Sequence, residues 1–128
     1  MKKTIYLAFL GLLLTTIGCN KTEKVSCSDE FVTIKAGVVD ATGKPVLGAN
    51  VFTIRQSNGD TIRRGTTIPG TVEYAVLTDN EKSKVNPQGE NFRFVVRKDN
   101  KFVTGIYRIK TNYCHLVYVS GPTSLTLK

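Results

Sequence analysis

The chain has 128 residues, of which 18 are lysine or arginine and 10 are aspartate or glutamate, so its formal net charge is +8 at pH 7. This length fits one domain of typical size. The basic residues are dispersed, and none of their runs is longer than a pair such as Arg63-Arg64 or Arg97-Lys98. Dispersed charge favours a solvated sheet face, so we expect no nucleic-acid partner.

The first predicted element is an export signal. Lys2 and Lys3 precede 14 apolar or hydroxylated residues, 4–17, and the run stops at Gly18-Cys19. A membrane-spanning helix needs about 20 apolar residues, so this run is too short to span. A charged start, a short apolar centre and a small residue before the cut are typical of a signal peptide. Residues 1–18 are therefore predicted to be removed.

The end of this signal resembles that of bacterial lipoproteins, in which a small residue precedes a cysteine that is lipidated before cleavage. Gly18 and Cys19 fit this pattern, whereas Thr16 stands where leucine is usual. The resemblance implies that Cys19 carries two or three acyl chains, palmitate among them, which give stable membrane attachment. The alternative is an ordinary secretory signal with a chance cysteine. Asn20 favours the outer membrane, by resemblance to the sorting rules of other bacteria.

The polar residues 19–28 are predicted to form a lipidated tether to a globular part, residues 29–128. Loss of residues 1–18 removes two lysines, which leaves 16 basic residues against 10 acidic ones. In the cell envelope, a positively charged domain meets anionic headgroups, surface polysaccharide and other envelope proteins.

Two cysteines, Cys27 and Cys114, remain after Cys19 is assigned to the lipid. In an oxidising compartment a disulfide between them is the default expectation. The alternative is a pair of free buried thiols, because spacing alone does not bring two Cα atoms within about 7 Å.

Residues 29–128 alternate between apolar and polar positions, which predicts an all-β domain. In the first strand, for example, Val32, Ile34, Ala36 and Val38 share one face. The expected strands are residues 31–39, 49–56, 61–64, 71–78, 91–98, 102–111, 113–119 and 124–127. Seven or eight short antiparallel strands at this spacing indicate a β-sandwich. Residues 79–90 form the longest loop, and long loops often carry function.

Residues 40–51 read Asp-Ala-Thr-Gly-Lys-Pro-Val-Leu-Gly-Ala-Asn-Val. They resemble the opening hairpin of carboxypeptidase regulatory-like domains, which are prealbumin-like, or more broadly immunoglobulin-like, sandwiches. The resemblance implies a turn made by Asp40 and a return strand that starts at Pro45. The Thr-Asp-x-x-Gly-x-Phe motif of that family begins at residues 78–81, but its glycine, Gly89, follows only after an insertion.

A narrower resemblance covers most of the mature chain. Cys27, residues 107–109, residues 114–116 and Ser120-Gly121 resemble a group of small lipoproteins from Bacteroidetes-type bacteria. That resemblance implies a lipid-anchored sandwich with a disulfide between the first and a late strand. It implies no particular activity.

Metal and cofactor chemistry is not expected. His115 is the only histidine, and zinc sites need three or four ligands. Cys114 is expected to point to the opposite face of the strand, so we expect His115 to be packed or hydrogen-bonded. Four aspartates recur at the hairpin spacing: Asp40, Asp60, Asp79 and Asp99. We expect each to cap its own turn, since none lies in the dense array that a calcium loop needs.

Catalysis is not expected either. The transthyretin-like branch of this architecture includes hydroxyisourate hydrolases, which resemble one another in paired histidines, an arginine and a C-terminal Tyr-Arg-Gly-Ser. Here Tyr107-Arg108 is followed by Ile109 and Lys110, and a second histidine is missing.

We therefore expect a non-catalytic binding or interaction module, or, alternatively, a structural or assembly subunit of an envelope complex. Aromatic residues interleaved with cations can stack on sugar rings or contact an acidic partner. The partner is expected to be an envelope protein or a polysaccharide. The predicted binding residues, beside loop 79–90, are Lys101, Arg108, Lys110, Tyr113 and His115.

Overall fold

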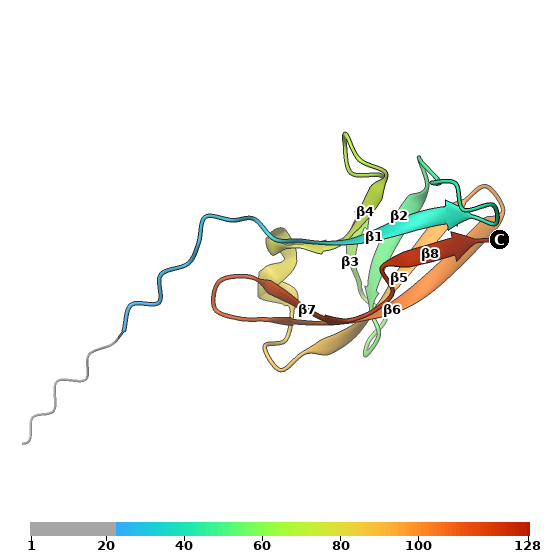
Figure 1. Cartoon of the computed structure of the whole chain (residues 1–128). Helices are drawn as coiled ribbons and strands as arrows, with labels where there is room; N and C mark the ends of the chain where they lie inside the picture. Colours follow the sequence, from blue (N-terminus) through green and yellow to red (C-terminus); the bar gives the residue numbers. More distant parts are fainter. Residues whose placement is uncertain (1–22) are drawn as a thin grey trace, which may run out of the picture.

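The computed structural model describes residues 23–128, so the predicted signal peptide and Cys19 lie outside the described residues. Residues 23–32, called the arm below, run as an extended segment into one end of the domain, and the C-terminus lies at the far end (Figure 1). Within residues 23–128, no helical segment has the length and apolar character needed to cross a bilayer.

Two sheets pack face to face, which confirms the predicted β-sandwich. Sheet A has three strands in the order β4-β1-β8, and sheet B has five in the order β3-β2-β5-β6-β7. The elements are β1 (Thr33–Asp40), β2 (Asn50–Arg55), β3 (Thr61–Gly65), β4 (Glu73–Thr78), the 3-10 helix η1 (Asp79–Lys84), β5 (Glu90–Lys98), β6 (Lys101–Thr111), β7 (Leu116–Ser120) and β8 (Ser124–Leu127).

One pair of strands departs from the antiparallel expectation. β8 runs parallel to β1, with Val38 opposite Leu125, whereas the other paired strands are antiparallel. The chain leaves sheet B after β7 and enters sheet A beside β1, so both strands point toward the end that lies away from the arm (Figure 1).

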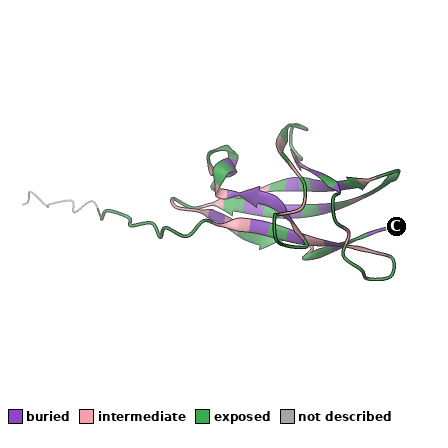
Figure 2. Cartoon of the chain, turned by 90° about the horizontal axis from the view of Figure 1, so that it is seen from above, coloured by how far each residue is buried: buried purple, intermediate pink, exposed green. Residues whose placement is uncertain are grey.

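The core lies between the sheets and follows the alternation along each strand (Figure 2). The rings of Phe94 and Tyr107 pack edge to face at 5.9 Å, and the Tyr107 hydroxyl donates to the Pro122 carbonyl at 2.6 Å. Gly121 has to be glycine, since a Cβ there would lie 2.5 Å from the Tyr107 ring. The largest fully buried side chains are Tyr74, Tyr107, Phe92, Phe94, Leu77 and Ile109.

Three predicted strand starts are wrong. β1 begins at Thr33 rather than at residue 31, because the Val32 N–H donates to the Asp79 carboxylate instead of to a neighbouring strand. β4 begins at Glu73 rather than at residue 71, because the Thr71 hydroxyl donates to the Ile68 carbonyl and prolongs the preceding turn. β7 begins at Leu116 rather than at residue 113. There the Asn112 side chain accepts from the backbone N–H groups of Cys114 and His115 and holds a bend.

The turn at residues 40–45 forms as predicted, but it does not make a hairpin within one sheet. Asp40 accepts from the N–H groups of Thr42 and Lys44 at 2.8 and 3.1 Å. Hydrogen bonds from Thr42 and Lys44 lower the pKa of Asp40 below its usual value. The turn links β1 in sheet A to β2 in sheet B, so the connection crosses between the sheets.

The expectation that all four aspartates cap their own turns is wrong. Asp40 does so, but in the next turn Asn58 caps the backbone and the Asp60 carboxylate bonds only the Asn58 side chain. Asp79 instead bonds the backbone of two other segments, Val32 and Leu116.

Candidate functional site

The outward side of sheet B, called the sheet B face below, gathers charge of one sign. Because strand residues alternate between faces, the residues that alternate with buried Phe92, Phe94 and Val96 along β5 point outward. The outward residues are Asn50, Phe52 and Ile54 of β2, Arg64 of β3, Asn91, Arg93, Val95 and Arg97 of β5, and Phe102, Thr104, Ile106, Arg108 and Lys110 of β6.

Five of these residues are cations and none is an acid. The ion pairs found within residues 23–128 join other residues, such as Arg55 with Glu90 and Arg63 with Glu81. Glu90, the acidic residue within the described strands of sheet B, is thus already paired with Arg55. The cations of the sheet B face are Arg64, Arg93, Arg97, Arg108 and Lys110.

Apolar side chains lie between these cations. The Arg64 guanidinium sits over the Phe52 ring at 5.0 Å. A shallow cavity of about 240 Å³ is lined by Phe52, Ile54, Arg64, Val95 and Arg97, together with Thr61. On the neighbouring β6, Phe102 is 67% exposed. Cations over and beside apolar surface can bind an anionic partner that also offers apolar area.

The outward side of sheet A differs. Its cation Lys35 pairs with Glu73 at 3.4 Å, and its other outward positions on β1 and β8 include Gly37, Ser124 and Thr126. The unbalanced positive charge is therefore a property of sheet B rather than of the sandwich as a whole.

The structure brings together only part of the predicted binding set. Arg108 and Lys110 lie on the sheet B face, two residues apart on β6. Lys101 starts the same strand at the far end of the domain, where it lines a cavity of about 490 Å³ with Asp40 and Leu47. Tyr113 is 77% exposed beyond the end of β6.

His115 is turned away from the predicted surface, since its side chain is only 19% exposed and bonds Asp79. Conversely, the sequence-based set lacks Arg64, Arg93 and Arg97. The alternation along β5 places Arg93 and Arg97 on the face that the buried phenylalanines do not occupy. That alternation was the sequence signal by which these two arginines could have been found.

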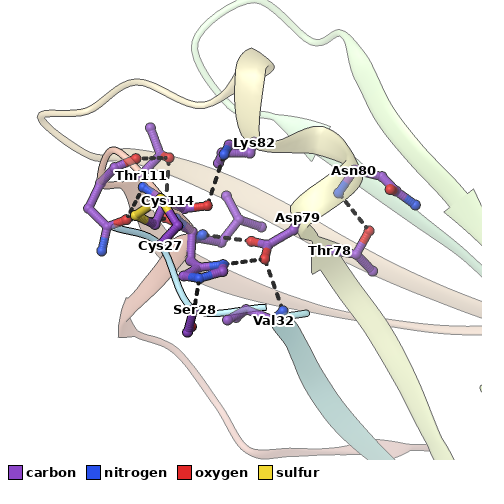
Figure 3. Close-up of polar contacts among 12 residues, drawn as sticks. Cys27, Ser28, Val32, Thr78, Asp79, Asn80, Lys82, Thr111 and Cys114 are labelled. Atoms are coloured by element: carbon purple, nitrogen blue, oxygen red, sulfur yellow. Dashed lines mark hydrogen bonds and ion pairs between the residues drawn. A yellow bond between two sulfur atoms is a disulfide. The ribbon is translucent and has the colours of Figure 1, made fainter. Parts of the chain in front are cut away.

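At the end of the sandwich where the arm enters, a disulfide joins the arm to the β6–β7 connection (Figure 3). Cys27 and Cys114 are bonded, with their Cα atoms 5.3 Å apart. The predicted pairing is thus confirmed over the alternative of free thiols. In the same region the Lys82 ammonium of η1 donates to the Cys114 carbonyl at 2.8 Å.

Asp79 is the centre of this junction (Figure 3). Its carboxylate accepts from Val32 N–H of the arm at 3.0 Å and from Leu116 N–H of β7 at 2.8 Å. Burial alone would raise the pKa of Asp79, but these backbone bonds and the His115 ring outweigh it and lower the pKa below its usual value. One carboxylate therefore fastens the arm to both sheets.

A Ser–His–Asp chain of hydrogen bonds runs through the same junction. The Ser28 hydroxyl lies 3.1 Å from His115 Nε2, and His115 Nδ1 lies 2.7 Å from the Asp79 carboxylate. This order of atoms matches the triad of serine hydrolases. Catalysis also needs an enclosed substrate site and oxyanion donors, whereas Ser28 lies on the exposed arm. We interpret the chain as part of the junction that holds the arm.

Among residues 23–128, no group of three or more His, Cys, Asp or Glu side chains is placed to hold a metal ion. No protein-family model matches the chain, and no curated protein or solved structure is detectably similar to it. The residues of the site itself are therefore the guide to function.

Proposed function

We propose that the protein is a lipid-anchored lipoprotein of the outer membrane whose β-sandwich is a non-catalytic binding module of the carboxypeptidase regulatory-like type. The sheet B face is its binding surface, and its partner is an acidic component of the envelope. The observation that carries this proposal is that five of the outward residues named for that face are cations and none is acidic.

The position of the arm supports an anchored role. Eight residue steps separate Cys19 from Cys27, so this part of the chain reaches at most about 28 Å. The disulfide fixes the end of this tether to the β6–β7 connection. The sheet B face, which begins with Lys110 and Arg108 at that end, would then remain close to the membrane and its surface polymers.

An assembly subunit is the second candidate, and the edge strand β7 favours it. Tyr118 and Val119 of this strand are 45% and 46% exposed, and exposed apolar edge strands are sites of strand pairing between proteins. Crosslinking through β7, rather than through sheet B, would distinguish this role.

Replacement of Cys19 by alanine is expected to abolish acylation and release the protein from the membrane fraction, because stable attachment requires the acyl chains. Metabolic labelling with an alkynyl fatty acid measures this directly. Continued labelling of Cys19→Ala would refute the assignment of the lipidation site.

Joint replacement of Arg108 and Lys110 by serine is expected to lower recovery of the envelope partner in a low-salt pull-down by about fivefold. Exposed charges contribute about 0.2 to 1 kcal/mol each and are screened by salt, so recovery by the unaltered protein should also fall as salt is added. Lys44→Ser with Lys128→Ser removes the same charge from outside sheet B and should leave recovery unchanged. Equal recovery with both variants would exclude this face.

A further inference from the structure

We propose that the partner of the sheet B face is a linear acidic polysaccharide with carboxylates along its length. This inference rests on the proposed binding function and names the chemical class of the ligand. It is drawn from the arrangement of the cations along the strands and from the side chains between them.

The strand register places four of the cations along one line. Arg97 lies opposite Phe102, Arg93 opposite Ile106, and Arg108 opposite Asn91. Lys110 follows Arg108 on β6. At about 3.4 Å per residue, the eight residue steps from Phe102 to Lys110 span about 27 Å. Arg97, Arg93, Arg108 and Lys110 therefore form a stripe along β5 and β6, called the cation stripe below.

The spacing of the cation stripe suits a polymer better than a compact anion. Successive outward residues on one strand lie about 7 Å apart, so neighbouring cations are separated by about 7 to 14 Å. Two neighbouring cations can converge on one small anion, but no single small anion spans all four. An extended chain that carries charge at intervals can pair with all four, and each contact raises the effective concentration for the next.

The side chains between the cations favour sugar rings over a lipid surface. Ile106 and Val95 lie within the face between arginines, and Val95 is buried there. Apolar side chains on this face can pack against the C–H faces of pyranose rings. The side chains of Asn91 and Thr104 can form hydrogen bonds with sugar hydroxyl groups. A membrane-binding surface would need more protruding apolar side chains than Phe102 and Ile106, the exposed large apolar residues of this face on β5 and β6.

The arginines also match the proposed anion. The planar guanidinium presents paired N–H donors that fit a carboxylate in a bidentate arrangement. Three of the four residues of the cation stripe are arginine, and none of the ion pairs within residues 23–128 uses them. Within residues 23–128, Arg108 donates one hydrogen bond to the Gln88 carbonyl at 3.4 Å. Its remaining donors, and those of Arg93 and Arg97, are available to a carboxylate.

The test uses the full chain, purified in non-ionic detergent, with polygalacturonate oligomers of increasing length in isothermal titration calorimetry at low salt. Oligomers that span the cation stripe are expected to bind about tenfold more tightly than those that reach only one or two cations. The methyl ester of the same oligomer has the same backbone without the charge, and it should not bind. Equal binding of the ester would overturn the proposal.

Replacement of Arg93 and Arg108 by serine should weaken binding of the long oligomer by about tenfold, about threefold for each lost charge. The charge-matched control, Lys44→Ser with Lys128→Ser, should bind as the unaltered protein does. Thermal unfolding of each variant verifies that the fold is intact. Equal loss with both variants would overturn the proposal, because it would mean that net charge alone decides binding.

Two further probes separate this inference from the proposed function. Poly-glutamate and vesicles with anionic phospholipid should bind more weakly than the long oligomer. If either binds more tightly, the polysaccharide inference is wrong, while the sheet B face remains a site for an acidic partner. If Arg108→Ser with Lys110→Ser leaves envelope recovery unchanged, the proposed function fails as well.

Discussion

Replacement of Cys114 by serine is expected to lower the free energy of unfolding by about 4 kcal/mol. The disulfide joins cysteines 87 positions apart, and a closed loop of that length restricts the unfolded chain by an amount worth about 4 to 5 kcal/mol. The whole stability of a small domain is typically about 5 to 15 kcal/mol. The variant should therefore unfold at a much lower denaturant concentration.

Chemical denaturation of the oxidised protein, the reduced protein and Cys114→Ser measures this effect. The reduced protein serves as the matched control, since it loses the same bond without a substitution, and it should behave like the variant. Alkylation followed by intact-mass measurement should modify both cysteines only after reduction. Coincident denaturation midpoints for the oxidised and reduced proteins would contradict the prediction.

The sheet architecture was accessible from sequence because it depends on local patterns. Alternation along residues 32–38 and 92–96 identifies the buried face, and the turn at residues 57–60 joins β2 to β3. The parallel pairing of β8 with β1 was not accessible. It depends on which sheet the last strand joins, and a period-two pattern carries no information about that choice.

The cation stripe shows the same limit for the site. Arg93 and Arg108 lie 15 positions apart in sequence, and they become neighbours only because Asn91 pairs with Arg108 across β5 and β6. Alternation indicates that each side chain points outward, but only the register between the strands shows which cations are neighbours. Lys101, by contrast, lies only seven positions before Arg108 in sequence. Because the strand is extended, these seven steps separate the two residues by about 24 Å.

The junction at the arm was the least predictable part, because its contacts span long stretches of sequence. The pattern assigned Asp79 to its own turn, as is usual for aspartate in turns. Instead Thr78 caps η1 together with Glu81, which leaves the Asp79 carboxylate available for Val32 and Leu116.

Replacement of Asp79 by asparagine is expected to lower the free energy of unfolding by about 3 kcal/mol. Bonds to a charged acceptor contribute about 1.5 to 3 kcal/mol each, and Asp79 accepts two from backbone N–H groups, of Val32 and Leu116. An amide retains one acceptor oxygen and turns an NH₂ group toward the other donors, so at least one backbone N–H loses its partner.

The effect should depend on pH with a definite sign. The pKa of Asp79 is lower in the folded protein than its usual value of 3.8, so its contribution is fully present above about pH 5 and is lost as the pH falls through the folded pKa. The stability difference between the unaltered protein and Asp79→Asn should therefore be largest near neutral pH and shrink in acid. Asp60→Asn, in an exposed turn, is the matched control and should change stability little.

Denaturation midpoints measured from pH 7 to pH 3 test this prediction. A stability difference that does not change with pH would show that the charge of Asp79 has no part in holding the arm. A fluorophosphonate probe adds a second readout on the same proteins. Labelling of Ser28 in the unaltered protein that disappears in Asp79→Asn would show a working Ser–His–Asp relay, and the junction would then be a catalytic site rather than the structural attachment of the arm.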